Sequence, residues 1–478
     1  MKYKQKSAEG LTRREILKGG LYGSLATALS PSLWLSGCGK QRHVQKPNII
    51  LIVVDTLRTD HVGCYGYHRN ITPNIDKLAQ EGILFRNAIS SAPWTAPSVA
   101  TMLTSQYPCV LGIRNHCVVI DSRFPLISEV LKQHGYATHG IVSHAFLSAN
   151  LGFAKGYDSY DEGPASSHGG ISSPAVTYKA VSFLQKKHEE PFFLFAHYFD
   201  PHYNFRLHGE YNYYPSYKGA VRDNHPILPL RQIRHSLSKD DIKYLLALYD
   251  SEIAFTDAHI GQLLDELKKQ GLYEDSIIII TSDHGEEFME RGWIGHSITL
   301  YQELIHVPLI MKLPRCKARI IDSPVGLIDI APTIYQYMGL KTPDGSEGKP
   351  LDISPHASIT TRPIFSETFK TALLGDRIEK IVVPIIAFRS IISGNSKLIY
   401  DEKKDLEQIY DLSEDPDERS NLAGQHGTQN KRLKALLSEW IDYVEAKQKR
   451  GPTQSEKELF TPEQRKQLES LGYLRSSP

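Results

Sequence analysis

Three residues with metal-binding side chains follow runs of apolar, β-branched residues. Asp55 directly follows the run 48–54, and Asp283 and His284 come shortly after the run 277–281. Carboxylate oxygens and imidazole nitrogens are donors that hold divalent metal ions. A lone aspartate in such a place is as readily a turn or helix-capping residue, but the same arrangement at two places favours a shared role. The sequence therefore predicts a divalent-metal site at these three residues.

A hydroxyl group suited to nucleophilic attack lies in the segment 90–104. Pro97 and Ser98 are typical of a first helical turn, so Thr95 is expected just before the N-terminus of a helix. Free backbone N–H groups and the helix dipole favour an anion there. A hydroxyl beside a metal ion and an anion site can become a nucleophilic alkoxide at neutral pH. Taken by itself, however, Thr95 is better interpreted as a helix-capping residue.

The elements that must position these residues are those of an α/β fold. The runs 48–54, 192–196 and 277–281 are continuously apolar, as in central strands buried on both faces. Between the last two, apolar residues of 242–267 keep largely to one helical face, and Gly271 is expected to follow the helix end. This alternation predicts a doubly wound α/β domain with its ligands outside the carboxyl ends of the strands.

The composition sets the broad class of the protein. The chain has 478 residues, of which 41% are hydrophobic and 23% charged, which excludes a disordered chain and a multi-span membrane protein. Lysine and arginine number 55 and aspartate and glutamate 54, so the formal net charge is only +1. A nucleic-acid partner is therefore not expected.

The first residues are typical of an export signal, because a basic segment precedes a short apolar stretch. The segment 12–18 (TRREILK) resembles the twin-arginine export motif, and 35–38 (LSGC) resembles the lipobox of bacterial lipoproteins. We expect an acylated Cys38 that anchors the protein to the bacterial cell envelope, on its periplasmic or cell-surface side. An ordinary transmembrane anchor is the alternative, although the apolar stretch is short and broken by Pro31.

The chain divides by pattern into five parts. They are an export signal (1–37), a lipidated tether (38–46), a catalytic domain (47–355), a smaller α+β subdomain (356–447) and a polar tail (448–478) that wraps the surface or is partly mobile.

Two features leave two interpretations open. The loop 203–236, rich in Tyr, His and Arg, either lines an anionic ligand or packs on itself. Cys109 and Cys117 either form a disulfide or remain free thiols.

Several longer motifs follow one another along the chain. They are NIILIVVDTLRTDHVGCYG (48–66), TPNID (72–76), TAPSVATMLTSQY (95–107), the segment 192–202 and SDHGEEFMERGWIGHSITLYQELIHVPLIMK (282–312). Together they resemble the motifs of the sulfatase family of the alkaline-phosphatase superfamily. The segment 410–422 resembles the family's C-terminal subdomain. The likeness covers residues 46–425 and implies a central mixed sheet flanked by helices, with a small α+β subdomain.

The resemblance assigns roles to six residues of this chain. Asp55, Asp283 and His284 match metal ligands, and Thr95 matches the nucleophile, which also binds the metal. Two histidines complete the site, namely His202 and His296. His202 matches a residue that holds the ester or leaving group. His296 stands where many members have lysine, so we expect it to act as a cation when protonated, with activity falling as pH rises.

The sequence also departs from the family's pattern. Active sulfatases begin the motif C/S-x-P-x-R with a residue oxidised to formylglycine, whereas this chain has Thr95 and, in place of the arginine, Val99. Threonine cannot give that aldehyde. The paired Asp-Asp of many sulfatases is Asp55-Thr56, and the Lys-x-His of arylsulfatases is not evident in 140–145.

An unmodified threonine together with Asp55, Asp283 and His284 resembles instead the site of the phosphoryl-transferring branches of the superfamily. The second-metal ligands of their diesterases have no clear match, so we expect one divalent ion, either Ca²⁺, Mg²⁺, Mn²⁺ or Zn²⁺.

Three hypotheses about the function follow. The first is a hydrolase of sulfate or phosphate esters, with phosphate chemically favoured and an anionic substrate such as a glycan or lipid head group. The others are a phospho-head-group transferase of the envelope and a catalytically inactive binding protein. The oligomeric state stays open.

Overall fold

The computed structural model describes residues 46–114, 119–166, 171–202, 204–354, 362–370, 377–378, 381–382, 386–425, 427–448 and 459–471. The predicted export signal, Cys38 and Cys117 lie outside these described residues. Cys109 is a buried free thiol whose sulfur accepts a hydrogen bond from Arg114. Among the described helices, none combines the length and the apolar character needed to cross a membrane.

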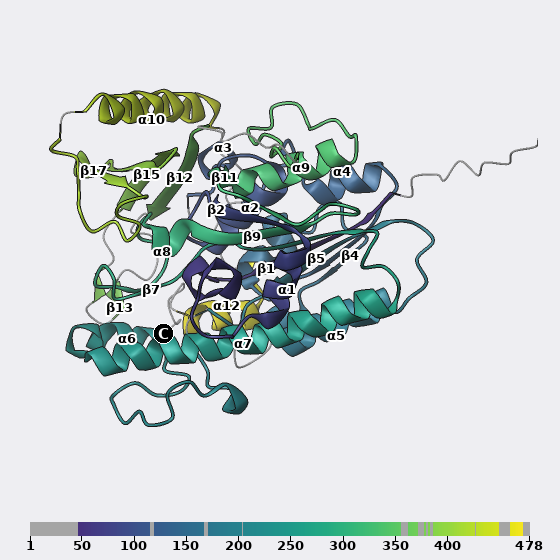
Figure 1. Cartoon of the computed structure of the whole chain (residues 1–478), viewed down its shortest axis with the longest axis horizontal. Coiled ribbons are helices and arrows are strands. Elements are labelled where there is room, and N and C mark those ends of the chain that lie inside the picture. The colour runs from purple at the N-terminus through teal and green to yellow at the C-terminus, as the bar shows by residue number, and fades with distance from the viewer. Residues whose placement is uncertain are drawn as a thin grey trace, which may run out of the picture. The chain divides into compact units, whose positions relative to one another are not determined.

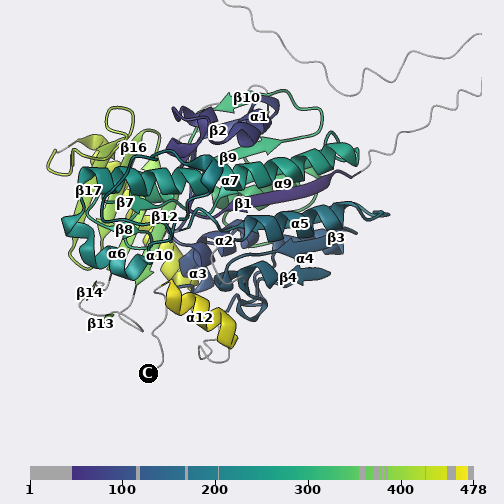
Figure 2. The same cartoon turned by 90° about the horizontal axis from the view of Figure 1, so that it is seen from below.

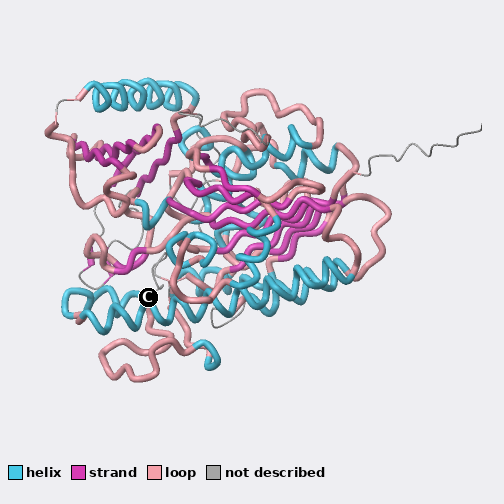
Figure 3. The backbone as a smooth tube through the Cα atoms, viewed as in Figure 1, coloured by secondary structure: helices cyan, strands magenta, loops and turns pink. Residues whose placement is uncertain are grey.

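A nine-stranded mixed sheet forms the centre of the fold, in the order β10-β2-β9-β6-β1-β5-β3-β4, with β11 paired to β2 (Figures 1 and 3). Its strands are β1 (Asn48–Val54), β2 (Ile83–Ile89), β3 (Ala137–Ile141), β4 (Ser159–Asp161), β5 (Phe192–Tyr198), β6 (Ser276–Ser282), β9 (His306–Lys312), β10 (Arg319–Ile321) and β11 (Val325–Gly326). The strands β4, β3, β5, β1 and β6 are parallel, and β9 runs antiparallel to both β6 and β2. The expected α/β fold with a central mixed sheet is therefore confirmed.

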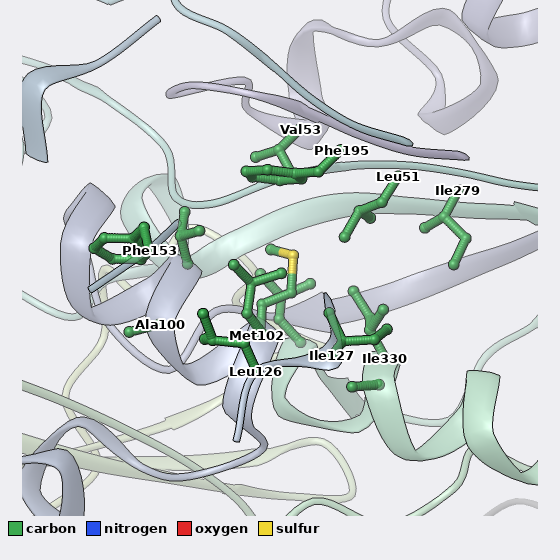
Figure 4. Close-up of a cluster of buried hydrophobic side chains, with 14 of the residues drawn as sticks. Leu51, Val53, Ala100, Met102, Leu126, Ile127, Phe153, Phe195, Ile279 and Ile330 are labelled. Carbon is green, nitrogen blue, oxygen red and sulfur yellow. The ribbon is translucent and has the colours of Figure 1, made fainter. Parts of the chain in front are cut away.

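Helices cover both faces of this sheet, which explains why its central strands are apolar throughout. On one face lie α1 (Pro73–Glu81), α5 (Ser173–Leu184) and α7 (Lys239–Lys269), as Figure 2 shows from below. On the other lie α2 (Thr95–Thr104), α4 (Ile127–Gln133) and α9 (Ile330–Tyr337). Successive strand residues face opposite sides, so Leu51 and Val53 pack with Met102 of α2 (Figure 4), whereas Ile50 and Ile52 pack with α7.

Among the described helices α7 is the longest, and it extends slightly beyond its apolar pattern at both ends. Ser238 caps its N-terminus by accepting a hydrogen bond from the Asp241 N–H, and the Asp241 side chain accepts from the Ser238 N–H in return. Gly271 follows the helix end with a positive φ of 70°, a conformation that glycine adopts without strain. Short helices complete the domain, namely α3 (Pro108–Leu111), α6 (Ile227–Ile233) and α8 (Gln302–Ile305).

A separate four-stranded antiparallel sheet forms the C-terminal subdomain, with α10 (Thr428–Lys447) packed on it (Figure 1). Its order is β12 (Ile364–Lys370), β15 (Ile386–Ser393), β16 (Ser396–Asp401) and β17 (Leu406–Asp411). Two hairpins pair β7 (Glu287–Phe288) with β8 (Ile294–Gly295) and β13 (Arg377–Ile378) with β14 (Ile381–Val382).

The described part of the C-terminal tail differs from the expected polar surface segment. Leu459 and Phe460 are buried, and so is Leu468 of α12 (Pro462–Ser470). All three belong to the hydrophobic core on the α2 face of the large sheet. The apolar residues of this segment are few and widely spaced, so the sequence pattern does not reveal that they enter the core.

Buried polar contacts join the subdomain to the domain of the large sheet. Lys397 and Glu418, both without exposed side-chain area, form an ion pair of 2.7 Å, and Glu418 also accepts a hydrogen bond from the Gln302 N–H. Strand β12 contacts segments that flank the site described below. The Ser366 hydroxyl donates to the Ser90 carbonyl (2.6 Å) and the Thr368 hydroxyl to the Ser297 carbonyl (2.8 Å).

The buried pair makes a testable contribution to stability. Replacing Lys397 by Met leaves the Glu418 carboxylate buried without its cation, which should lower the free energy of unfolding by about 3–5 kcal/mol. Urea denaturation of the full chain measures this loss. Lys434→Met is the matched control, because the partly exposed pair of Lys434 with Glu407 should be worth at most about 1 kcal/mol. Equal effects of the two substitutions would contradict the assigned role.

Candidate active site

The register of the strands places Asp55, Asp283 and His197 at one edge of the large sheet. Val53 of β1 lies opposite His197 of β5 and Thr281 of β6. Since side chains alternate, Asp55 and Asp283, each two residues further along, lie level with each other and face α2, as His197 also does. The carboxyl ends of neighbouring parallel strands therefore bring these side chains together.

Asp55, Asp283 and His284 form a compact group of buried metal-binding donors, as the sequence predicts. Their donor atoms all lie within 4.8 Å of one another, and His284 Nε2 is 3.6 Å from both Asp55 Oδ1 and Asp283 Oδ2. His284 Nδ1 donates to the Gly285 carbonyl (2.9 Å), so that Nε2 keeps its lone pair for a ligand role. Among the described residues, neither of those two carboxylate oxygens has a hydrogen-bond partner.

The electrostatics of this group fit a divalent cation. Burial raises the pKa of Asp55 well above its usual range, and the charges of Asp283 and Glu286 raise it further. Burial also raises the pKa of Asp283, although His284 and the Thr56 N–H oppose this. Two buried carboxylates facing one point repel each other unless a cation lies between them. The donor set is therefore suited to one divalent ion.

Thr95 lies beside these donors. Its Oγ1 is 3.4 Å from His284 Nε2 and 3.5 Å from Asp55 Oδ2. The helix α2 begins at Thr95 itself, with Trp94 as the N-cap, so the expected start is wrong by one residue. The Ser98 hydroxyl donates to the Asp283 carbonyl (2.6 Å) and thereby fixes the first turn of α2 against the end of β6. The N-terminus of α2, which favours anions, is thus held at the site.

The structure also brings His202 and His296 to the site. The ring centre of His296 lies 4.5 Å from that of His284 and 4.9 Å from that of His202. Asp200 helps to fix the turn before His202 by accepting hydrogen bonds from the Ser172 and Ser173 N–H groups. All six residues assigned from the sequence therefore gather in one buried region.

The environment of His296 acts in both directions on the expected cation. Its Nδ1 lies 2.9 Å from Glu286 Oε1, a contact that favours a protonated ring. Burial, followed by the proximity of His284 and His202, lowers the pKa of His296 well below its usual range. The lowered pKa favours a neutral imidazole at neutral pH, against the cation that the sequence leads us to expect.

Two further histidines at the site are not assigned by the sequence. His197 Nε2 lies 3.6 Å from Asp55 Oδ2, and burial lowers the pKa of His197 to about 3. His144 follows the end of β3, with its ring centre 5.7 Å from that of His202. The signal for both is a histidine soon after an apolar run. Val142-Ser143-His144 even has the spacing of Lys-x-His, with valine in the place of lysine.

The described part of the loop, 204–236, packs on itself and on α7, and it contacts the segment that carries His296. The Tyr217 ring lies 5.9 Å from that of Tyr214 in the same loop and stacks on Tyr244 of α7 with ring centres 3.9 Å apart. Arg231 of α6 donates to the Ile294 carbonyl (2.7 Å) and lies against Gly295, the neighbour of His296. Gly295 has a φ of 116°, and a Cβ there would lie 2.0 Å from an Arg231 nitrogen, so only glycine fits. The loop therefore supports the segment that carries His296.

One cavity of about 280 Å³ lies apart from these residues. It is lined in part by Arg58, Arg291 and the subdomain residues 416, 417 and 419, and none of the metal-binding triad lines it. Arg58 pairs with Asp60 and Glu290, and Arg291 pairs with Glu303. The lining charges thus neutralise one another, and the geometry of the buried triad is the better guide to the chemistry.

Comparison with known proteins adds the family context. The family model "Sulfatase" matches residues 47–340, and the model "N-sulphoglucosamine sulphohydrolase, C-terminal" matches residues 289–447. Arylsulfatase K of Homo sapiens is 25% identical, with 84% of each chain covered. N-acetylglucosamine-6-O-sulfatase of Bacteroides thetaiotaomicron is 24% identical, with 87% of this chain and 90% of that protein covered.

A solved structure shares the fold of this chain. It is the phosphonate monoester hydrolase of Agrobacterium radiobacter, with a TM-score of 0.67 at 20% identity. The match covers 84% of this chain and 96% of that one.

The protonation state of His296 can be tested by a pH–rate profile. Because burial lowers its pKa, we expect His296 to be neutral at neutral and alkaline pH, whereas a lysine, whose ordinary pKa is about 10.4 before burial lowers it, should keep its charge to a higher pH than a histidine does. We therefore expect His296→Lys to change the size of the rate but to leave the alkaline limb of the profile where it is. A limb that moves to higher pH in the variant would show that wild-type His296 works as a cation.

Proposed function

The chain belongs to the sulfatase family, and from this premise we propose that it hydrolyses phosphate or sulfate esters with the Thr95 hydroxyl as nucleophile. The observation that carries this proposal is the position of Thr95 Oγ1. It lies 3.4 Å and 3.5 Å from donor atoms of the buried Asp55–Asp283–His284 group, at the N-terminus of α2. Relatives with sulfatase names support an ester hydrolase as the class of enzyme.

Asp55, Asp283 and His284, together with Thr95, would hold one divalent ion. When bound, such an ion would lower the pKa of the Thr95 hydroxyl and neutralise charge on the ester oxygens. Its identity among Ca²⁺, Mg²⁺, Mn²⁺ and Zn²⁺ is left open by these four donors alone.

The chain's own residues then account for the first half of the reaction. Asp55 Oδ2 is placed to accept the Thr95 proton as Oγ1 forms a bond to phosphorus or sulfur and the ester oxygen leaves. His296 lies beside His284 and next to His202, and an imidazole N–H can donate a hydrogen bond to the leaving oxygen. Water then cleaves the Thr95 ester, which releases the free anion and restores the hydroxyl.

Phosphate esters are the chemically easier substrates for this site. A formylglycine hydrate expels sulfate by elimination, whereas an ester of threonine must be cleaved by direct attack of water. A phosphoryl–threonine ester can be attacked at phosphorus, as in other members of the superfamily. A similar solved structure is named a phosphonate monoester hydrolase, and relatives are named for sulfated glycans, so we propose an anionic glycan or lipid-head-group ester as substrate.

The proposed cellular setting is the bacterial envelope. It depends on the twin-arginine-like segment 12–18 and on the predicted acylation of Cys38, both outside the described residues. A head-group transferase would share the same first half-reaction, and it differs only in that an acceptor hydroxyl replaces water. Analysis of the product, as free anion or as a new ester, distinguishes the two.

Substitution of Thr95 tests the proposed nucleophile. On a panel of aryl sulfate, phosphate monoester and phosphate diester, Thr95→Ala should lower turnover by roughly 10³-fold or more, because no other hydroxyl replaces Oγ1. Thr95→Ser keeps the hydroxyl and should retain measurable activity. The control is Thr104→Ala at the other end of α2, where Oγ1 donates to the Ala100 carbonyl and accepts from the Gln106 N–H, both away from the Asp55–Asp283–His284 group.

Removal of the metal gives an independent check on the same proposal. Dialysis of the full chain against a chelator should abolish turnover, and addition of the divalent ion should restore it in the wild type and not in Thr95→Ala. Turnover that survives both the chelator and Thr95→Ala would overturn the proposal. A wild type that turns over none of the three ester classes and binds no metal would support the inactive binding protein.

A further inference from the structure

We propose that His197 is a further protein ligand of the metal centre, in place of the second carboxylate that Asp55-Thr56 lacks. The inference rests on the metal-dependent part of the proposed function. It names a donor that the family resemblance did not assign, and it narrows the class of metal ion that the site prefers.

The position of His197 follows from the strands. His197 lies in β5, opposite Val53 of β1, and its odd-numbered neighbours Phe193 and Phe195 pack in the core on the α2 face. The side chain of His197 therefore points to the same side as Asp55. It has no exposed area, and its Nε2 lies 3.6 Å from Asp55 Oδ2.

The hydrogen bonds of Ser143 determine which ring nitrogen of His197 carries the proton. The Ser143 hydroxyl lies 2.5 Å from the His197 carbonyl oxygen and 3.1 Å from His197 Nδ1. A carbonyl oxygen can only accept, so the single hydroxyl proton goes to it. The Ser143 oxygen must then accept a hydrogen bond from Nδ1–H. In the neutral ring, Nε2 consequently carries the lone pair.

This lone pair faces a carboxylate. At 3.6 Å, His197 Nε2 and Asp55 Oδ2 are too far apart for a good hydrogen bond, and among the described residues Nε2 has no hydrogen-bond partner. Two acceptor atoms that face each other in a buried site are unfavourable unless a cation lies between them. Metal–nitrogen and metal–oxygen bonds are about 2.0–2.2 Å for zinc, so donors 3.6 Å apart can bind the same ion.

Asp55 thereby has one imidazole beside each of its oxygens. His284 Nε2 lies 3.6 Å from Oδ1, and His197 Nε2 lies 3.6 Å from Oδ2. Both imidazoles donate through Nδ1, to the Gly285 carbonyl and to Ser143, which is the usual support for a metal-bound histidine. The two histidines thus have the same tautomer and the same kind of second hydrogen bond.

A second imidazole changes the preferred ion. Ca²⁺ and Mg²⁺ favour sites built from oxygen donors, whereas imidazole nitrogen suits borderline transition-metal ions such as Zn²⁺. A centre of two carboxylates, two imidazoles and the Thr95 hydroxyl therefore favours Zn²⁺ over Ca²⁺ or Mg²⁺.

The experiment measures metal binding directly, without an assay of turnover. Competition with a chelator gives the Zn²⁺ affinity of the purified full chain and of His197→Gln and His197→Asn. We expect both variants to bind Zn²⁺ more weakly by over ~100-fold, beyond the loss that removal of a supporting partner typically causes. His139→Gln is the matched control, because His139 of β3 stacks on Phe183, away from the triad, and its loss should leave the affinity unchanged.

A spectroscopic readout separates a ligand from a supporting residue. Proton NMR of the Co²⁺-loaded wild type should show two solvent-exchangeable, strongly shifted imidazole N–H signals, one for each Nδ1–H. The His197 variants should retain one. A single such signal in the wild type, with Zn²⁺ affinity unchanged in the variants, would overturn the role of His197 and leave the proposed function standing. Failure of the wild type to bind either ion would overturn both.

Discussion

The arrangement of the site depends on the electrostatic repulsion between two buried carboxylates that the strands hold close together. Asp55 and Asp283 follow adjacent parallel strands in the same register, so they lie level and face the same helix. Isolation of such charges from water costs several kcal/mol per ion unless a partner of opposite sign is present. The backbone around them is adapted to this need. Thr56, a β-branched residue with a φ of 56°, turns its N–H toward Asp283 Oδ1 and leaves the other oxygen for a ligand.

This constraint bears on the proposal that a member of the sulfatase family uses an unmodified threonine. Val99 of α2 stands where active sulfatases have the arginine that accompanies formylglycine. Its side chain is fully buried in the core between α2 and the sheet. The helix therefore uses that position for packing, and it contributes to the site through Thr95 and the anchoring hydroxyl of Ser98. The surroundings of residue 95 are consistent with a hydroxyl nucleophile beside a cation, and the aldehyde chemistry of formylglycine has no support in them.

Much of this fold and site can be predicted from the sequence, because strongly apolar strands determine their own positions. The apolar runs that form β1, β5 and β6 are enough to predict Asp55, Asp283 and His284 at one edge of the sheet. The protonation state of the His296 imidazole cannot be predicted in this way. It depends on His284, His202 and Arg231, which only the tertiary fold brings near. The apolar run 192–196 predicts a strand that ends before His197, whereas β5 continues to Tyr198, so the pattern alone does not give the direction of the His197 side chain. The burial of Leu459 and Leu468 leaves no periodic pattern in the sequence.

The central claim is that the Thr95 oxygen forms a covalent bond to the transferred group. Mass spectrometry of the enzyme, quenched in acid during turnover and digested, tests this claim most directly. The account predicts an unmodified threonine at position 95 in the resting enzyme. During turnover, the peptide that contains Thr95 should gain the mass of one phosphoryl or sulfuryl group, and the gain should be located on Thr95 by fragmentation. Turnover without any adduct on this peptide, or with an adduct on another residue, would contradict the account.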